Sequence, residues 1–232
     1  MTSSAPPLSK PVASVAAPAV DKVRLFGPVV LNVTDSSTAK PGEARMFDHP
    51  LLEWLTRMNP WSLPVVYVPL IAYYLWRGSQ AGFGAASLVG LFFGGWFVWT
   101  FIEYLIHRFA FHLTVRGRAS LFFTYLIHGV HHAYPDDSKR WVMPPAVSLG
   151  ITLGFHAVLR PLLGEGFAPL LAGGAAGYLA YDMLHFAVHR GQMPGRLFRA
   201  LRRYHFQHHY ASSARRFGVS TPLWDYVFNT AR

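Results

Sequence analysis

The sequence contains no cysteine and few charged residues. The absence of cysteine among 232 residues excludes disulfide bonds, thiolate zinc sites and iron–sulfur clusters. Charged residues make up 14% of the chain, whereas about 25% is usual in soluble domains. Hydrophobic residues reach 52%, and the mean hydropathy is +0.23. This balance argues against an ordinary soluble domain and indicates long segments inside a lipid bilayer.

Acidic residues are also scarce, with 11 Asp and Glu against 21 Lys and Arg, so the net charge is +10. Such a charge is compatible with binding to nucleic acid or to an anionic lipid surface. No basic run is interleaved with aromatic residues in the way that nucleic-acid-binding segments are. We therefore expect the lipid bilayer as a partner and no nucleic acid.

The first 45 residues differ from the rest of the chain. They are rich in Ala, Pro, Ser and Val, and they hold six of the 17 prolines. They lack the charged start, apolar core and small-residue cleavage site of a signal peptide. We predict that residues 1–45 are a disordered or weakly ordered tail and that residues 46–232 form one domain.

Four apolar segments approach the roughly 20 residues needed to cross a bilayer. The first and second, and the third and fourth, are joined by short links, which predicts two helical hairpins. The sequence thus indicates an all-α integral membrane protein with four transmembrane helices, at about residues 61–76, 81–106, 145–163 and 167–186.

Basic residues predict the orientation. Residues 1–60, 107–142 and 188–232 together hold nineteen of the 21 Lys and Arg, and the two short links supply only Arg77 and Arg160. Loops rich in Lys and Arg stay on the cytoplasmic side. We predict a multi-pass protein whose N- and C-termini and 107–142 loop are cytoplasmic.

Histidines gather where the apolar segments end. Ten of the twelve fall in four clusters, HRFAFH, HGVHH, HFAVH and HFQHH. Neutral imidazole is the commonest metal ligand in proteins. Ten histidines are enough for two ions, so we predict a dimetal centre in a cytosolic helical cap, with these ligands: His107, His112, His128, His131, His132, His185, His189, His205, His208 and His209.

Helical spacing adds detail to this prediction. Residues three or four apart share a helix face, whereas adjacent residues diverge by about 100°. Neighbouring histidines in each HH pair should therefore serve different metals. His107 and His112 are five residues apart, which predicts a distorted helix end or a π-bulge. His49 and His156 stand alone and are not expected to be ligands.

Two carboxylates lie close to the clusters. Glu103 precedes His107 by four residues, and Asp182 precedes His185 by three. Each is a candidate to accept the free N–H of a ligating imidazole. Alternatively, each forms an ion pair with a neighbouring arginine.

The all-nitrogen ligand set suits Fe, Cu, Zn or Ni rather than Mg or Ca. A hydrolytic zinc site normally needs only three protein ligands, so ten histidines are excessive for hydrolysis. Two irons with open positions can use O₂ to attack an unactivated C–H bond, and the bilayer would supply apolar substrates. A metal transporter and a bis-histidine haem protein are the alternatives from other classes.

Five stretches resemble the membrane fatty-acid hydroxylases of the sterol desaturase superfamily, and most closely the fatty acid 2-hydroxylases. The resemblance covers residues 51–230. The first histidine pair and both HxxHH blocks are common to the wider superfamily, whereas the HHAYPDD…PP and FGVS…WDYVF stretches are more specific. The stretches are LLEWLTRMNPWSLPVVYVPL, EYLIHRFAFH, HGVHHAYPDDSKRWVMPP, GYLAYDMLHFAVHRG and YHFQHHYASSARRFGVSTPLWDYVFNT.

The resemblance implies a function. Its ten matched histidines would hold two metal ions, iron in the active enzyme and zinc possible in a purified sample. The reaction would be O₂-dependent hydroxylation at the 2-position of long-chain fatty acyl groups, free or in ceramide-type sphingolipids. A carotenoid hydroxylase or a sterol desaturase of the same superfamily is the alternative. Four basic residues would be candidates for binding a head group, or would meet anionic lipid: Lys139, Arg140, Arg202 and Arg203.

Two features depart from the family pattern. Some relatives carry a fused b-type cytochrome, and nothing in residues 1–45 resembles one. Electrons are therefore expected from a separate protein, a b-type cytochrome or a ferredoxin with its reductase. In addition, Arg190 stands where many relatives have a second histidine, which leaves the ten-histidine set intact.

Overall fold

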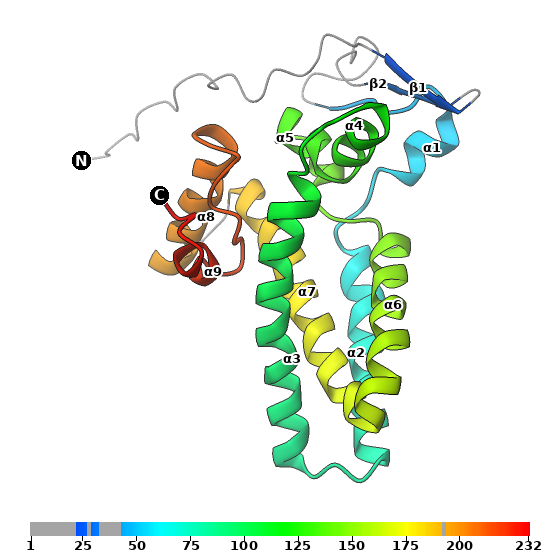
Figure 1. Cartoon of the computed structure of the whole chain (residues 1–232), viewed down its shortest axis with the longest axis vertical. Coiled ribbons are helices and arrows are strands. Elements are labelled where there is room, and N and C mark those ends of the chain that lie inside the picture. The colour runs from blue at the N-terminus through cyan, green and yellow to red at the C-terminus, as the bar shows by residue number, and fades with distance from the viewer. Residues whose placement is uncertain (1–21, 27–28, 33–42, 192–193) are drawn as a thin grey trace.

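Four long helices lie side by side and carry shorter elements at one end (Figure 1). The computed structural model describes residues 22–26, 29–32, 43–191 and 194–232. The long helices confirm the helical character of the four apolar segments, and they are α2 (Ser62–Gln80), α3 (Ala85–Leu105), α6 (Pro145–Leu163) and α7 (Phe167–Arg190).

Most of the shorter helical elements lie at the upper end and flank of this bundle, whereas η4 joins α6 to α7 at the lower end (Figure 1). Two are π-helical, η1 and η2, and two are 3₁₀ turns, η3 and η4. In chain order, the shorter elements are α1 (Pro50–Leu55), η1 (Ile106–Phe111), α4 (Arg118–Thr124), η2 (Tyr125–Gly129), α5 (Val130–Ala133), η3 (Ser138–Arg140), η4 (Gly164–Gly166), α8 (Arg196–Tyr210) and α9 (Leu223–Val227).

The ends of the long helices follow from local sequence. Helix α6 starts with Pro145, whose missing N–H would have no partner in a first helical turn. Helix α7 ends at Gly191, which adopts the left-handed conformation (φ 85°) that closes many helices. Among the described residues, two helical runs are long and apolar enough to cross a membrane, Ala85–Phe111 and Ser138–Arg190. The second run includes both α6 and α7.

Helix α7 is the centre of the bundle. Its most extensive contacts are with α3 and then α2, whereas α2 and α3 touch each other little. The predicted hairpin of the first two segments is therefore wrong as a packing unit, because α7 lies between them (Figure 1). Glycines make this approach possible, because a Cβ on Gly173 would lie 1.8 Å from the carbonyl oxygen of Phe92.

A small hairpin precedes the helices. Strands β1 (Lys22–Phe26) and β2 (Val29–Asn32) are antiparallel, with Lys22 opposite Asn32. The chain is thus not purely α-helical, and this hairpin falls inside the predicted tail. The rest of that tail, apart from residues 43–45, lies outside the described residues. Ala44 is buried, and its backbone N–H donates to Asp137 (3.0 Å).

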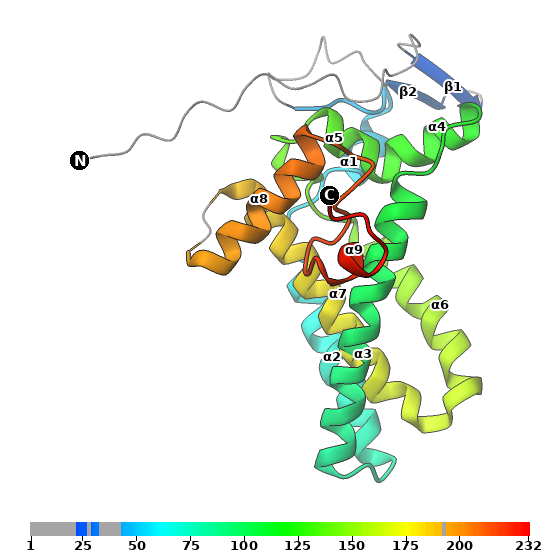
Figure 2. The same ribbon diagram turned by 60° about the vertical axis from the view of Figure 1, so that its left-hand side comes forward.

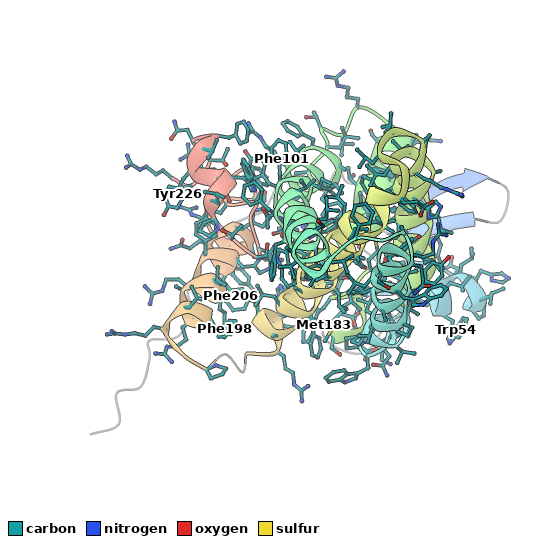
Figure 3. All side chains as sticks on the ribbon, turned by 90° about the horizontal axis from the view of Figure 1, so that it is seen from below. Trp54, Phe101, Met183, Phe198, Phe206 and Tyr226 are labelled. Carbon is teal, nitrogen blue, oxygen red and sulfur yellow. The ribbon has the colours of Figure 1, made fainter. Side chains whose placement is uncertain are left out.

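The C-terminal segment, residues 194–232, lies along one side of the bundle. Figure 2 shows α8 beside the upper end of α7 and α9 beside α3. Seen from below, Phe101 of α3 lies on the side that faces α9 (Figure 3), and its ring is 4.6 Å from that of Trp224. This placement brings the histidines of α8 over the ends of α3 and α7.

Candidate metal centre

The structure brings all ten predicted histidines together in two groups of five. Within each group, the ligand nitrogens lie within 4.8 Å of one another. Two nitrogens bound on opposite sides of one ion would be about 4.2 Å apart, given metal–nitrogen distances of about 2.1 Å. The first group is His107, His112, His128, His132 and His208, and the second is His131, His185, His189, His205 and His209.

Adjacent histidines separate as the helical spacing predicts. His131 joins the second group and His132 the first, while His208 joins the first and His209 the second. Each HH pair therefore contributes to both groups. The two groups must be neighbours, and the rings of His132 and His209 stack across them at 4.2 Å.

The π-helix η1 explains the odd spacing of the first cluster. A π-helix bonds residues five apart, and the N–H of His112 donates to the carbonyl of His107 (3.3 Å). Both rings consequently lie on one face, 5.1 Å apart. The predicted distortion is confirmed. The second π-helix, η2, which the sequence did not reveal, ends next to His128 and turns it into the same group.

Backbone carbonyls orient three of the rings. The Nδ1–H groups of His107, His185 and His208 donate to the carbonyls of Phe217 (2.5 Å), Trp141 (2.7 Å) and Arg215 (2.6 Å). A proton on Nδ1 leaves the Nε2 lone pair free to bind a metal. The Nε2 of His185 is buried and has no hydrogen-bond partner in the part of the chain that the structure describes, which fits a nitrogen that binds a metal ion.

The remaining nitrogens also fit a cation. His128 Nε2 lies 3.1 Å from His107 Nε2 and 2.9 Å from His132 Nε2. Neutral imidazoles that face each other can share only one proton per contact, so several inward lone pairs have no proton to accept. A metal ion in each group would satisfy them together, and the donor set therefore fits two ions.

Burial keeps these imidazole rings neutral, which is the protonation state that binds metal. Desolvation is the main cause that lowers the pKa of His128 and His131 well below the ordinary value, and neighbouring histidines add to the effect. Desolvation also lowers the pKa of His112 to about 3 and that of His208 to about 4. The imidazoles are therefore neutral at pH 7, which metal coordination requires.

Among the described residues, neither candidate carboxylate forms a hydrogen bond or an ion pair with a histidine. Glu103 accepts the backbone N–H groups of Val219 (2.8 Å) and Ser220 (2.9 Å), together with the Ser220 hydroxyl. Asp182 accepts the N–H of Met143 (3.1 Å) and the hydroxyl of Tyr178 (2.9 Å). The prediction that they accept imidazole protons is therefore wrong. The described residues do not form the alternative either, which was an ion pair between each carboxylate and a neighbouring arginine.

Each carboxylate instead holds a segment whose carbonyl orients a histidine. Glu103 fixes the chain just after Phe217, and Asp182 fixes the chain just after Trp141. Asp225, which sequence reasoning did not single out, is fully buried and accepts the N–H groups of Phe217 (2.9 Å) and Gly218 (2.8 Å). Only its place in the WDYVF stretch could have drawn attention to it.

The predicted head-group residues do not form one cluster at the centre. The guanidinium of Arg140 is buried and bound to Glu53 (2.5 Å), so its role is structural and the prediction is wrong for this residue. Arg202 donates to the carbonyl of Val188 (3.0 Å), and Lys139 and Arg203 are exposed. His156 bonds Tyr74 (2.8 Å) and, like the exposed His49, stands outside both groups.

An apolar cavity of about 360 Å³ runs through the bundle towards the histidines. Side chains of α3, α6 and α7 form most of its wall. Phe111 and Tyr181 line it next to the histidines: Phe111 stacks on His128 (4.9 Å) and Tyr181 on His185 (6.3 Å). Although no histidine is among the described residues that line the cavity, one lining residue thus packs on each group, a feature that the sequence alone did not reveal.

The fold and the site define a class of protein: a helical bundle with apolar membrane-length helices, an apolar cavity and ten converging histidines that fit two metal ions. The family model "fatty acid hydroxylase" matches residues 92–230. The chain belongs to the fatty acid hydroxylase family, which makes it a hydroxylating oxidoreductase, and the resemblance drawn from its motifs is confirmed.

Curated relatives cover most of the chain. It is 34% identical to "Dihydroceramide fatty acyl 2-hydroxylase FAH1" of Arabidopsis thaliana over 187 residues, which are 80% of this chain and 79% of that protein. It is 34% identical to "Fatty acid 2-hydroxylase" of Homo sapiens over 209 residues, 80% of this chain and 56% of the relative. The solved structure "Full length scs7p (only hydroxylase domain visible)" is 36% identical, with a TM-score of 0.73 over 77% of this chain and 69% of that one.

Proposed function

We propose that this protein hydroxylates the 2-position of long-chain fatty acyl groups, free or within ceramide-type lipids, using O₂ and electrons from a separate donor protein. The observation that carries the proposal is the apolar cavity, two of whose lining residues, Phe111 and Tyr181, each stack on a histidine of a different group. The names of the relatives support the substrate class, since they are fatty acyl and ceramide hydroxylases.

The two groups of five histidines would hold two metal ions, iron in the active enzyme. An iron pair with nitrogen ligands supplies the activation of O₂ that hydroxylation of an unactivated C–H bond requires. The protein would hold the reacting carbon next to the metal ions and keep water out of the site. The apolar wall binds the acyl chain and excludes water, while Phe111 and Tyr181 direct one end of the chain towards the histidines.

We further infer that α2, α3, α6 and α7 all cross the membrane and that the histidines form a cap on the cytoplasmic side. The concentration of Lys and Arg in residues 1–60, 107–142 and 188–232 supports this orientation. A soluble electron donor, a b-type cytochrome or a ferredoxin with its reductase, could then reach the site. The elements that carry the histidines, among them α5, α8 and the end of α7, lie at one end of the bundle rather than half-way along it (Figure 1), which disfavours a transport site.

Lipid analysis tests the proposed reaction directly. Host cells that make sphingolipids and supply a reductant should accumulate 2-hydroxy acyl chains when they express the protein. Cells that express His128→Ala should not. Mass spectrometry of intact lipids and of hydrolysed acyl chains measures both. Hydroxylated carotenoids or altered sterols without 2-hydroxy acyl chains would assign the protein to another substrate and overturn the proposal.

Asp182 should support the second metal through the chain segment that it holds. Replacing Asp182 by Ala leaves the N–H of Met143 without its acceptor and frees the nearby carbonyl of Trp141, which orients His185. We expect the affinity for one of two ions to fall about 10-fold or more, as is typical for partners behind the ligands. Chelator titration with metal analysis measures this loss.

Two matched variants control the Asp182 experiment. Asp182→Asn keeps a carbonyl oxygen that can accept from Met143, so it should retain most of the affinity. Tyr178→Phe removes the other hydrogen bond of Asp182 and should change metal binding little. Retention of both ions by Asp182→Ala, at the chelator concentration that wild type withstands, would contradict the supporting role.

A further inference from the structure

A second, open cavity lies beside the first histidine group, and we call it the polar cavity because four of its eight lining residues are polar. Its volume is about 380 Å³, and it is bounded by the end of η1 with the residues that follow it and by residues 213–217. His112 of the first group forms part of its wall, together with Arg108, Thr114 and Ser213. None of the described residues that line it is acidic, and the guanidinium of Arg108 is the permanent charge among them.

Arg108 is held in place but retains free donors. Its Nη1 donates to the hydroxyl of Tyr104 (2.6 Å). Its guanidinium lies over the rings of Phe109 (5.0 Å) and Phe217 (6.0 Å). Among the described residues no carboxylate forms an ion pair with it. A guanidinium carries five N–H donors, so most of them can bind a ligand in the cavity.

The polar and apolar cavities lie on two sides of the helix face that carries His107 and His112. Ile106, Ala110 and Phe111 line the apolar cavity, whereas Arg108 lines the polar one. Among the described residues, no lining residue is common to the two cavities. A lipid with its chain in the apolar cavity and its head in the polar cavity would therefore have to cross the helix face that carries the first histidine group. The carbon next to the acyl carbonyl would then lie at that crossing.

We propose that this polar cavity is the head-group subsite and that Arg108 donates hydrogen bonds to the carbonyl oxygens of the acyl head. The inference rests on the proposed function and deepens it, because it places the 2-carbon rather than a carbon further along the chain beside the histidines. The shared chemistry is an oxygen-rich acyl head, which either the carboxylate of a free fatty acid or the amide of a ceramide can supply.

The test is binding, measured without turnover. The full-length, metal-loaded protein in lipid nanodiscs is titrated with three probes: a long-chain fatty acid, a ceramide with the same acyl chain, and an alkane of equal length. Arg108→Gln should weaken binding of the acid, the ceramide or both by about 10- to 100-fold, as expected for loss of a charge-assisted hydrogen bond. Alkane binding and metal content should not change.

Control variants separate this role from a structural one. Tyr104→Phe removes the hydrogen bond that anchors Arg108 but keeps the guanidinium, and should change binding of the acid and the ceramide no more than about threefold. If Arg108→Gln does not fold, Ala214→Trp can fill the polar cavity from an exposed loop, and should produce the same selective loss.

The outcomes distinguish the subsite from the reaction. A loss confined to the acid identifies the carboxylate as the ligand, and a loss shared with the ceramide identifies the carbonyl that both contain. Equal weakening of the alkane, or full retention of the acid and the ceramide, overturns the subsite. Selective binding without 2-hydroxy product would keep the subsite and reject the proposed function. Formation of 2-hydroxy product, together with unaltered binding by Arg108→Gln, would keep the proposed function and reject the subsite.

Discussion

Replacing His128 by Ala should abolish hydroxylation and remove metal from the first group, while the protein stays in the membrane. The Nε2 atom of His128 lies within 3.1 Å of those of two other members of the group, His107 and His132. Loss of a partner behind a ligand typically costs about 10- to 100-fold, so loss of the ligand itself should cost more. Product formation and the metal content per chain measure the effect.

His156→Ala is the matched control, because it removes a histidine of α6 that contacts Tyr74 and belongs to neither group. This variant should keep two ions per chain and most of the activity. If His128→Ala bound two ions and turned over substrate at the wild-type rate, His128 would not be a ligand.

Replacing Gly173 by Ala should destabilise the bundle, whereas the same change at Gly174 should be tolerated. A Cβ on Gly173 would lie 1.8 Å from the carbonyl oxygen of Phe92, which real contacts do not allow, so α3 would have to move. A Cβ on Gly174 would meet only the oxygen of Gly95, at an ordinary 3.8 Å. Overpacking of this kind costs about 1–3 kcal/mol or more.

Thermal unfolding of the purified variants measures the difference. Gly173→Ala should unfold at a lower temperature and lose hydroxylation, since α3 forms one wall of the apolar cavity. Gly174→Ala should unfold close to the wild-type temperature, because alanine favours the helical backbone over glycine by about 0.5–1 kcal/mol. Equal unfolding temperatures for the two variants would show that the close contact of α3 and α7 does not limit stability.

The histidine positions show how far local sequence reaches. Spacing along a helix depends only on the 3.6-residue repeat, so the separation of His131 from His132 follows from the sequence before any tertiary contact is known. The five-residue interval from His107 to His112 likewise predicts a departure from α-helix, and η1 is that departure. Both features are local and therefore predictable.

The environment of Glu103, Asp182 and Arg140 was not predictable in this way. Each has one or more partners that lie between 39 and 117 residues away in the sequence. Their only nearby partners among the described contacts are Tyr178 for Asp182 and Asp137 for Arg140. In the sequence the two carboxylates are close to histidines of the same helix. In the structure, however, the backbone carbonyls of Phe217 and Trp141, which lie in loops, accept the imidazole protons instead. Arg140 is likewise taken up by Glu53 rather than exposed to a ligand.

By itself the sequence determined the long apolar helices, the membrane-type composition, the ten histidines and the family, because each depends on composition or on spacing within one segment. Only the tertiary structure decided which histidines share a group, which carbonyls orient them and where the two cavities lie. The physical reason is the packing of α7 between α2 and α3, with α8 folded over its end. That arrangement depends on close helix contacts at glycines and on backbone hydrogen bonds between distant segments.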